Sequence, residues 1–336
     1  MARLRPLRSF FAVLGVALAA ALVACLLPEN PYQRWQLLDG TLHAKSRWIY
    51  ERIHFDPRPI DVAVVGPSRA IRAVDARHLE AALRGQGVQA HVVNFALPEG
   101  GRDVNDVIVE EMLREKTPKL LIIGVIEKPS RFGHPAYKYL APPSMVADPG
   151  YATNLDYLAN LAYLPFRQMR LFVADVLPGG AFGLSKTFRA ERYTPDPTQD
   201  ILFTTRTGEV VPADQPARRD DLEAGARDLK ARTTPPLLPR AFADLEFGDD
   251  RHYIRRIVAA AERRHVKVAF LFLPFYTGPQ AAQEGDFYRR FGPVWNAGFV
   301  APHPELYSDY AHLTTQGADS LLPWLAPKVA QELKAP

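Results

Sequence analysis

The chain has 336 residues, 47% of them hydrophobic and 23% charged, which is an ordinary composition for a folded protein. The 41 lysines and arginines exceed the 37 aspartates and glutamates by four, but three of the arginines lie within residues 1–8, so the rest of the chain carries only +1. A nearly neutral body is a poor electrostatic surface for DNA or RNA, and we expect no nucleic-acid partner.

The first 28 residues have the pattern of a membrane segment. The nineteen residues Ser9–Leu27 contain no charge, and as a helix they would span about 28 Å, close to the ~30 Å hydrocarbon core. By the positive-inside rule, the preceding arginines belong on the cytoplasmic side. We expect a single-pass anchor over residues 1–28 in the inner (cytoplasmic) membrane, with the folded domain on the periplasmic side.

Two other export signals fit the same segment. One is a lipoprotein signal acylated at Cys25, the only cysteine in the sequence, and the other is a cleaved signal peptide. Each of the three places the body outside the cytoplasm, where a body without further cysteines needs no disulfide.

Residues 29–60 are expected to be a connector, and residues 61–336 an α/β domain. Apolar runs predict strands at Val62–Val65, Ala90–Phe95, Leu120–Ile126 and Val268–Leu273. Amphipathic patterns predict helices at Asp75–Arg84, Val104–Arg114, His252–Arg264 and Thr314–Leu333. This alternation predicts a doubly wound, mostly parallel sheet between two helical layers, in a three-layer, flavodoxin-like arrangement.

The alternation is lost over residues 135–250, which we interpret as an irregular insertion that covers one end of the sheet. A hairpin is expected there, between Leu202–Phe203 and Val210–Val211. Two helical segments, Leu155–Leu164 and Phe166–Leu177, are expected to be separated by Pro165.

An apolar stripe runs along the second of these segments, through Phe166, Met169, Val173 and Leu177. We expect it to be core. Because Arg167 and Arg170 stand beside it, contact with a membrane or a partner is the alternative.

Ser68 is the first candidate for chemistry. The first strand runs directly into Gly66-Pro67-Ser68-Arg69, so the serine stands at the carboxyl end of a strand, where open α/β sheets bind ligands. Gly66 permits a tight turn, and the following helix directs backbone N–H groups toward an anion. These features suit a serine nucleophile with an oxyanion hole; the alternative is a serine that simply caps the helix.

Asp309 and His312 are the second element, just before the final predicted helix. Their three-residue spacing can place both side chains on one side of a turn. The carboxylate would then fix the imidazole tautomer while the other ring nitrogen faces a nucleophile. In isolation a capping aspartate would explain this motif, but with Ser68 the chain offers Ser, Asp and His at two ends of one sheet-forming unit.

A serine block after the first strand and an Asp-x-x-His block before the last helix resemble the SGNH/GDSL hydrolase superfamily. The Gly-Pro-Ser-Arg form and the N-terminal anchor are similar to a branch of extracytoplasmic proteins that work beside membrane-bound O-acyltransferases in modifying alginate, teichoic acid and other envelope polymers. The resemblance covers Asp61–Ile126 and Val266 to about Leu333. It implies an SGNH-like fold with Ser68 as nucleophile, His312 as general base and Asp309 as the acid that orients it.

The resemblance also implies an oxyanion hole. Gly100 or Gly101 could supply the family's glycine after the second strand. The family's asparagine after the third strand is absent; Glu127 stands there, and its carboxylate would repel an oxyanion unless it is protonated or turned away. Asn94, at the end of the second strand, is the amide that could take over this role.

Arg69 adjoins the serine and could hold the carboxylate of an acidic sugar or acyl group, or pair with a structural carboxylate. No motif for a nucleotide is present, no metal-ligand spacing such as H-E-x-x-H occurs, and we expect neither a metal nor another cofactor.

These observations predict an O-acyltransferase or esterase that acts on acyl esters, in the simplest case acetyl esters, of a cell-envelope polysaccharide. The resemblance implies a membrane-bound O-acyltransferase as partner. The alternative is a non-catalytic envelope scaffold that keeps the fold and binds glycan or that partner.

Overall fold

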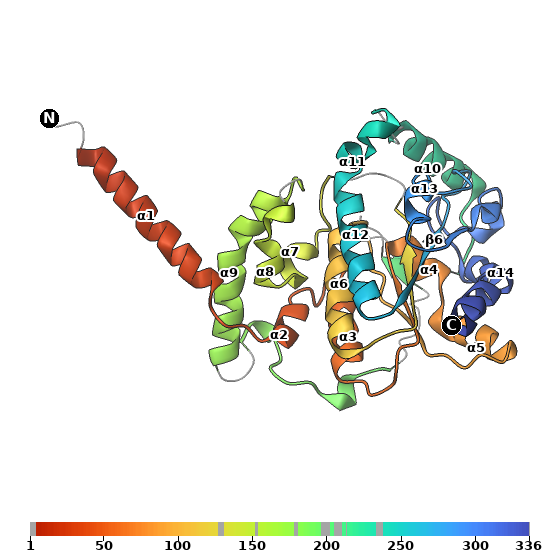
Figure 1. Cartoon of the computed structure of the whole chain (residues 1–336), viewed down its shortest axis with the longest axis horizontal. Helices are drawn as coiled ribbons and strands as arrows, with labels where there is room; N and C mark the ends of the chain where they lie inside the picture. The colour runs from red at the N-terminus through yellow and green to blue at the C-terminus, as the bar shows by residue number, and fades with distance from the viewer. Residues whose placement is uncertain are drawn as a thin grey trace.

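A five-stranded sheet forms the centre of the protein in the computed structural model, which describes residues 5–126, 131–151, 154–177, 181–195, 202–204, 210–212, 214–232 and 238–335 (Figure 1). Its strands are β1 (Val62–Val65), β2 (Val92–Asn94), β3 (Leu120–Gly124), β6 (Lys267–Phe272) and β7 (Val294–Asn296). They lie in the order β2-β1-β3-β6-β7, and every pairing is parallel. The predicted parallel α/β sheet is confirmed.

The order of the strands reverses at β1. From β1 the chain moves outward to β2 and then returns to form β3 on the other side of β1. In doubly wound sheets such a reversal opens a crevice beyond the carboxyl ends of the two strands, here β1 and β3. The Gly66–Arg69 turn follows β1 directly.

Helices cover both faces of the sheet. Of all helices in the described residues, whether they cover the sheet or not, the longer ones are α1 (Arg5–Cys25), α3 (Lys45–His54), α5 (Ala76–Gly85), α6 (Arg102–Glu115), α9 (Tyr157–Val176), α10 (Arg219–Arg232), α12 (Gly248–Arg263) and α14 (Thr315–Lys334). The short ones are α2 (Pro31–Trp35), α4 (Ser68–Ala73), α7 (Tyr137–Leu140), α8 (Pro143–Val146), α11 (Ala243–Glu246) and α13 (Gly285–Tyr288).

Alternating residues of each strand enter two separate cores, as the two-residue period of a strand requires. Ala63 and Val65 of β1 pack in the core formed with α3, α6 and α12. Val62 and Val64 pack in the core formed with α4, α5 and α14. The sheet is therefore buried on both faces, which explains why its strands are continuous apolar runs in the sequence.

The segment expected to be a connector is part of the first core. Trp35 of α2 and Ile49 and Ile53 of α3 are fully buried and belong to the same cluster as the apolar side chains of α6. Helix α3 thus packs on α6, α2 packs on α3, and both are built into the domain.

Within the insertion, the predicted hairpin is confirmed in its two strands, β4 (Leu202–Thr204) and β5 (Val210–Pro212), which pair antiparallel. The predicted break at Pro165 is wrong. Tyr157–Val176 is one continuous helix, because a single proline removes one backbone hydrogen bond while the packing of the rest of the helix is retained. The strand β7 was not predicted, since three residues give too short a pattern.

Helix α1 projects away from the rest of the molecule and touches it only at its carboxyl end, beside α9 (Figure 1). In the part of the chain that the structure describes, none of the helices combines the length and the hydropathy required of a membrane span.

The burial of α3 leads to a stability prediction. Ile49→Ala should lower the free energy of unfolding by about 2–5 kcal/mol, because it leaves a cavity in a closed core. Leu245→Ala, at a side chain that is 64% exposed, is the control and should change it by less than about 0.5 kcal/mol. Denaturant unfolding measures both, and equally small effects would show that residues 29–60 do not contribute to the core.

Candidate active site

Ser68, His312 and Asp309 form one hydrogen-bonded chain. Ser68 Oγ lies 2.7 Å from His312 Nε2, and His312 Nδ1 lies 2.7 Å from Asp309 Oδ2. Since an aspartate carboxylate can only accept, the Nδ1 proton is donated to Asp309, which leaves Nε2 to accept from the serine hydroxyl. This is the tautomer that a general base acting on Ser68 requires.

The Asp309 carboxylate is held by its own turn. Its Oδ1 accepts hydrogen bonds from the backbone N–H groups of Ala311, at 2.7 Å, and His312, at 2.8 Å. Burial raises the pKa of the Asp309 carboxyl, but the hydrogen bonds from the His312 ring and from these backbone groups outweigh it and bring the pKa below its usual value. The carboxylate is thus kept ionised against the imidazole.

Ser68 owes its position to two glycines. Gly66 has φ +153°, and a Cβ there would lie 3.0 Å from the Cα of Gly124, at the end of β3. A Cβ on Gly124 would in turn lie 3.1 Å from the Ala70 side chain. The first turn of α4 therefore closes directly over β3, and Ser68 begins that helix, where its backbone N–H has no intrahelical acceptor.

The loop with Asp309 and His312 is tied at both ends. Tyr307 and Leu313 form a β-bridge, and Thr314 caps α14 by accepting from the N–H of Gly317 at 2.9 Å. The loop is also joined to the segment after β6, through the bond from Tyr276 N–H to the carbonyl of Tyr310, at 2.8 Å. Both halves of the triad are thereby fixed near the carboxyl ends of the sheet strands.

Arg69 is directed into the protein. Its guanidinium donates to the carbonyls of Leu273 and, at 3.4 Å, Val125, and lies 4.1 Å from the centre of the Phe275 ring. Only 7% of the residue is exposed. These contacts tie α4 to the segments after β3 and β6, and the burial leaves little of the guanidinium for a substrate to reach.

Asn94 is also engaged by the protein. Its amide donates both protons, to the carbonyls of Ala70 and Val74 at 2.9 Å each, while its oxygen accepts from the N–H of Ala96. In this structure the side chain stabilises the end of α4 and offers no amide proton to an oxyanion. Glu127, the other residue that bears on the missing asparagine, lies outside the described residues.

Gly100 and Gly101 lie in the loop that connects β2 to α6. That loop, which we call the glycine loop, contacts the Gly66–Arg69 turn (the serine turn), because the N–H of Leu97 donates to the carbonyl of Gly66 at 3.1 Å. A side chain at Gly101 is excluded, since its Cβ would lie 2.5 Å from the Cβ of His134. Gly100 is open by comparison, with the Ile126 side chain 3.9 Å from where its Cβ would stand.

His134 holds the glycine loop by a hydrogen bond to its backbone. Its Nε2–H donates to the carbonyl of Pro98 at 2.6 Å, and its Nδ1 accepts from the N–H of Ala136 at 3.1 Å. Burial lowers the pKa of the ring to about 3, so it stays neutral. Asp103, fully buried, accepts the backbone N–H of His134 at 2.9 Å and so fixes the histidine in turn.

A cavity of about 550 Å³ opens beside the glycine loop. It is lined by acidic, basic and apolar side chains and by glycine backbone, namely Gly100, Gly101, Arg102, Asp103, Ile126, Arg131, Phe132, Gly133, Asn154, Leu155, Asp249, Asp250 and Tyr253. Arg102 joins the cavity to the end of β3, because its Nη1 donates to the carbonyl of Gly124 at 2.7 Å.

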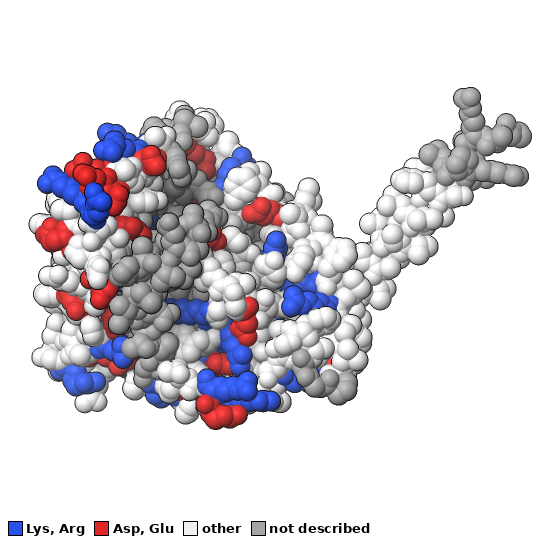
Figure 2. Space-filling view, turned by 180° about the vertical axis from the view of Figure 1, so that it is seen from behind, with Lys and Arg blue, Asp and Glu red and all other residues white. Residues whose placement is uncertain are grey.

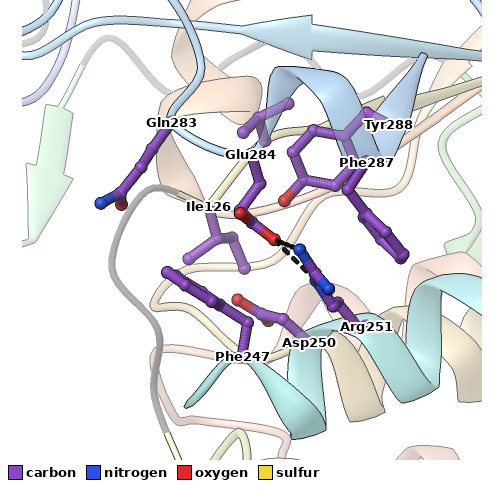
Figure 3. Close-up of a pocket in the computed structure, with 9 residues that line it drawn as sticks. Ile126, Phe247, Asp250, Arg251, Gln283, Glu284, Phe287 and Tyr288 are labelled. Atoms are coloured by element: carbon purple, nitrogen blue, oxygen red, sulfur yellow. Dashed lines mark hydrogen bonds and ion pairs between the residues drawn. The ribbon is translucent and has the colours of Figure 1, made fainter. Parts of the chain in front are cut away.

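A second, almost closed hole adjoins this cavity and shares Ile126 and Asp250 with it (Figure 3). Its volume of about 10 Å³ holds no more than about one water molecule. Figure 3 shows the Arg251–Glu284 ion pair across it, in which Arg251 Nε donates to Glu284 Oε2 at 2.6 Å and Nη2 lies 2.5 Å from the same oxygen. The pair connects α12 to the segment before α13 and closes this side of the cavity.

The structure therefore brings Ser68, Asp309 and His312 together, places Gly100 and Gly101 on the neighbouring loop, and engages Arg69 and Asn94 elsewhere. Sequence reasoning missed Arg72, which is one helical turn after Ser68 in α4 and buried. Burial lowers the pKa of Arg72, and the negative charge of Asp309 opposes this effect. Sequence reasoning also missed Asp103 and Arg102. The only signal for them was their place directly after the Gly-Gly pair, at the start of a helix.

Comparison with known proteins adds no relative. No protein-family model matches the chain, and no curated protein sequence matches it significantly.

Asp103 gives a prediction about pH. Burial raises its pKa to about 7, against about 3.9 in an unfolded chain, so between these values the unfolded chain binds fewer protons and a rise in pH favours unfolding. Asp103→Asn cannot ionise. Its free energy of unfolding relative to wild type should therefore rise by roughly 1 kcal/mol or more from pH 4 to pH 7.

Denaturant unfolding at several pH values measures this difference. Asp220→Asn, at an exposed side chain, is the control and should follow the wild-type curve. If the free energies of unfolding of Asp103→Asn and wild type changed with pH in the same way, the raised pKa of Asp103 would be contradicted.

Proposed function

We propose that this protein is an SGNH-like O-acyltransferase or esterase that acts on acyl esters of a cell-envelope polysaccharide through Ser68, His312 and Asp309. The observation that supports it best is the pair of 2.7 Å contacts by which the imidazole of His312 joins the serine hydroxyl to the aspartate. The position of Ser68 directly after β1, at the reversal of strand order, agrees with it.

In the first half-reaction, His312 Nε2 takes the hydroxyl proton as Ser68 Oγ attacks the carbonyl carbon of the ester. The ester bond breaks, His312 returns the proton to the departing alkoxide, and the acyl group stays on the serine. In the second half, an acceptor hydroxyl gives its proton to His312 and attacks the acyl carbon. The bond from that carbon to Ser68 Oγ then breaks, and His312 returns the proton to Oγ, which regenerates Ser68. A sugar as acceptor gives acyl transfer, and water gives hydrolysis.

The tetrahedral intermediates carry a negative oxygen that needs N–H donors. Ser68 N–H, at the start of α4, is one candidate, and a backbone N–H of Gly100 or Gly101 is the other. The bracing of the glycine loop by His134 and Asp103 supports this role, because donors held in place before the reaction require no reorganisation during it.

The cavity beside the glycine loop is the proposed site for the polysaccharide. Carboxylates accept hydrogen bonds from sugar hydroxyls, and aromatic rings pack on sugar faces. At this cavity Asp250 supplies a carboxylate, and Phe132, which is 59% exposed, supplies a ring. Burial raises the pKa of Asp250 to about 6, against the opposing effect of Arg102. This mixed, weakly charged lining suits a hydroxyl-rich chain.

We further propose that α1 anchors the protein in the inner membrane, with the domain on the periplasmic side. Ser9–Leu27 carry no charge, and large apolar side chains along α1 are exposed, among them Phe10, Val16 and Val23 at 60–71%. A membrane-bound O-acyltransferase is the partner that would deliver acyl groups at this surface.

The decisive variants are Ser68→Ala and His312→Ala. Each should lower turnover of a chromogenic acetyl ester by about 10³-fold or more, because the nucleophile or its base is lost. A fluorophosphonate probe should label Ser68 in the wild type and neither variant, as read by mass spectrometry of the labelled peptide. Ser320→Ala, at a serine of α14 that donates to the carbonyl of Gly317, is the matched control.

Folding of each variant is checked by circular dichroism. The contrary result is a folded wild-type protein that neither hydrolyses the ester nor reacts with the probe, both with and without its membrane partner. It would contradict a catalytic function and favour the non-catalytic scaffold.

The polysaccharide site has its own test. Leu155 lines the cavity and is 57% exposed, so Leu155→Trp should narrow the cavity without disturbing the core. We expect kcat/KM for an acylated polysaccharide to fall about tenfold, the loss of roughly 1.4 kcal/mol of binding, while the small acetyl ester is unaffected. Equal effects on both substrates would place the polymer elsewhere.

A further inference from the structure

Helix α9 buries several polar side chains and exposes several large apolar ones. Arg167 and Gln168 are each only 1% exposed, and the Arg167 guanidinium donates to the carbonyls of Lys138 and Ala141 at 2.8 and 2.7 Å. Phe166 and Met169, predicted to be core, are instead 64% and 42% exposed. The core prediction is wrong, because the space under α9 is filled by the polar face together with Leu164 and Leu171.

Six apolar residues of α9 form one strip, which we call the α9 face: Leu158, Ala162, Phe166, Met169, Val173 and Val176. Val173 is half-buried and the other five are exposed. Ala159, Arg170 and Asp175 are also exposed, outside this strip. At 100° per residue the six positions of the α9 face fall within an arc of about 80°. None of the six is charged, and Leu158 and Val176, near the two ends of the face, are 74% and 58% exposed. Scattered apolar residues on a surface are ordinary, but a helix-long apolar strip marks an interaction surface.

The α9 face lies beside the base of α1. The two helices are in contact, and Gln168 Nε2 donates to the carbonyl of Leu27, just past the end of α1 (Figure 1). Between Ser9 and Cys25, α1 carries no charged residue, and this length of the helix is white in Figure 2. The two apolar surfaces are therefore neighbours, and whatever covers one is adjacent to the other.

The exposed side chains of α1 indicate what covers the α9 face. Its exposed side chains include Phe10, Phe11, Val13, Val16, Leu18, Leu22 and Val23, which by helical position point in all directions around the axis. A partner helix or a second copy covers one side of a helix only, whereas lipid covers every side. Exposure on all sides is what the bilayer anchor proposed for α1 requires.

We propose that the α9 face lies on the surface of the bilayer that holds α1, with its apolar side chains at the boundary between head groups and acyl chains. The edge of the face fits this location. Arg170 lies 5.6 Å from the ring of Phe182, and Lys138 lies 5.3 Å from the rings of Tyr139 and Tyr163. Cations beside tyrosines are typical of the membrane–water interface, where they meet anionic head groups.

The inference rests on the anchor in the proposed function, so the test includes a reporter on each helix. The full chain carries Cys25→Ser and one new cysteine, at Leu18 on α1, at Leu158 or Phe166 on the α9 face, or at exposed Leu245 on α11 as the control. Each protein is labelled with an environment-sensitive fluorophore. It is reconstituted into phosphatidylethanolamine–phosphatidylglycerol vesicles with a nitroxide on the upper acyl chain.

We expect several-fold quenching at Leu18, Leu158 and Phe166, and none at Leu245. Quenching at Leu18 alone would overturn the α9 inference and leave the anchor in place. Its absence at Leu18 would overturn the anchor and the inference together.

A second variant separates lipid from protein as the occupant. Adding Leu158→Glu to the Phe166 reporter should lower its quenching several-fold while Leu18 stays quenched, because a carboxylate is costly at the acyl boundary. If the Phe166 reporter is not quenched and instead crosslinks between two copies of the chain, the α9 face binds a second copy and not the bilayer. That result would contradict the proposal.

Discussion

The hydrogen bond between Ser68 and His312 joins residues 244 positions apart, and it exists only because the sheet brings the two ends of the domain together. Parallel strands deliver all their carboxyl ends to one edge, so the turn after β1 and the loop tied to the segment after β6 meet there. The close contact of Gly66 with Gly124 completes the alignment. A larger residue at either glycine would lift α4 from β3 and separate the hydroxyl from the imidazole.

A second group of buried polar residues surrounds this centre. Asp103 holds His134, His134 holds the glycine loop, and Arg102 holds the end of β3. Ionisable groups in such positions cost folding free energy, as the raised pKa of Asp103 shows. Their cost is understandable if they keep backbone N–H groups in fixed positions, since a site that relies on preformed dipoles requires a rigid frame.

The sheet and the triad could be predicted because their patterns are local. Buried strands such as Leu120–Gly124 are continuous apolar runs, and the Asp309–His312 spacing lies within one turn. The roles of Arg69 and Asn94 could not be predicted, because their partners are backbone carbonyls, which have no signature in the sequence. The orientation of α9 failed for a related reason. Hydrophobicity shows that a face will be covered, but it does not distinguish covering by the protein itself from covering by something outside it.

The junction between α1 and the domain has a further consequence. Only residues 26–30 separate α1 from α2, and this link is pinned by Gln168 at Leu27 and by the bond from Asn30 to the carbonyl of Lys186, at 3.1 Å. A flexible tether would let the domain sample a hemisphere whose radius grows with linker length. A link that is held by these hydrogen bonds instead keeps the domain at a fixed distance from the end of α1. If α1 anchors the protein in a bilayer, as we propose, Ser68 would be held at one distance from the membrane, and that distance would select which acyl esters it can reach.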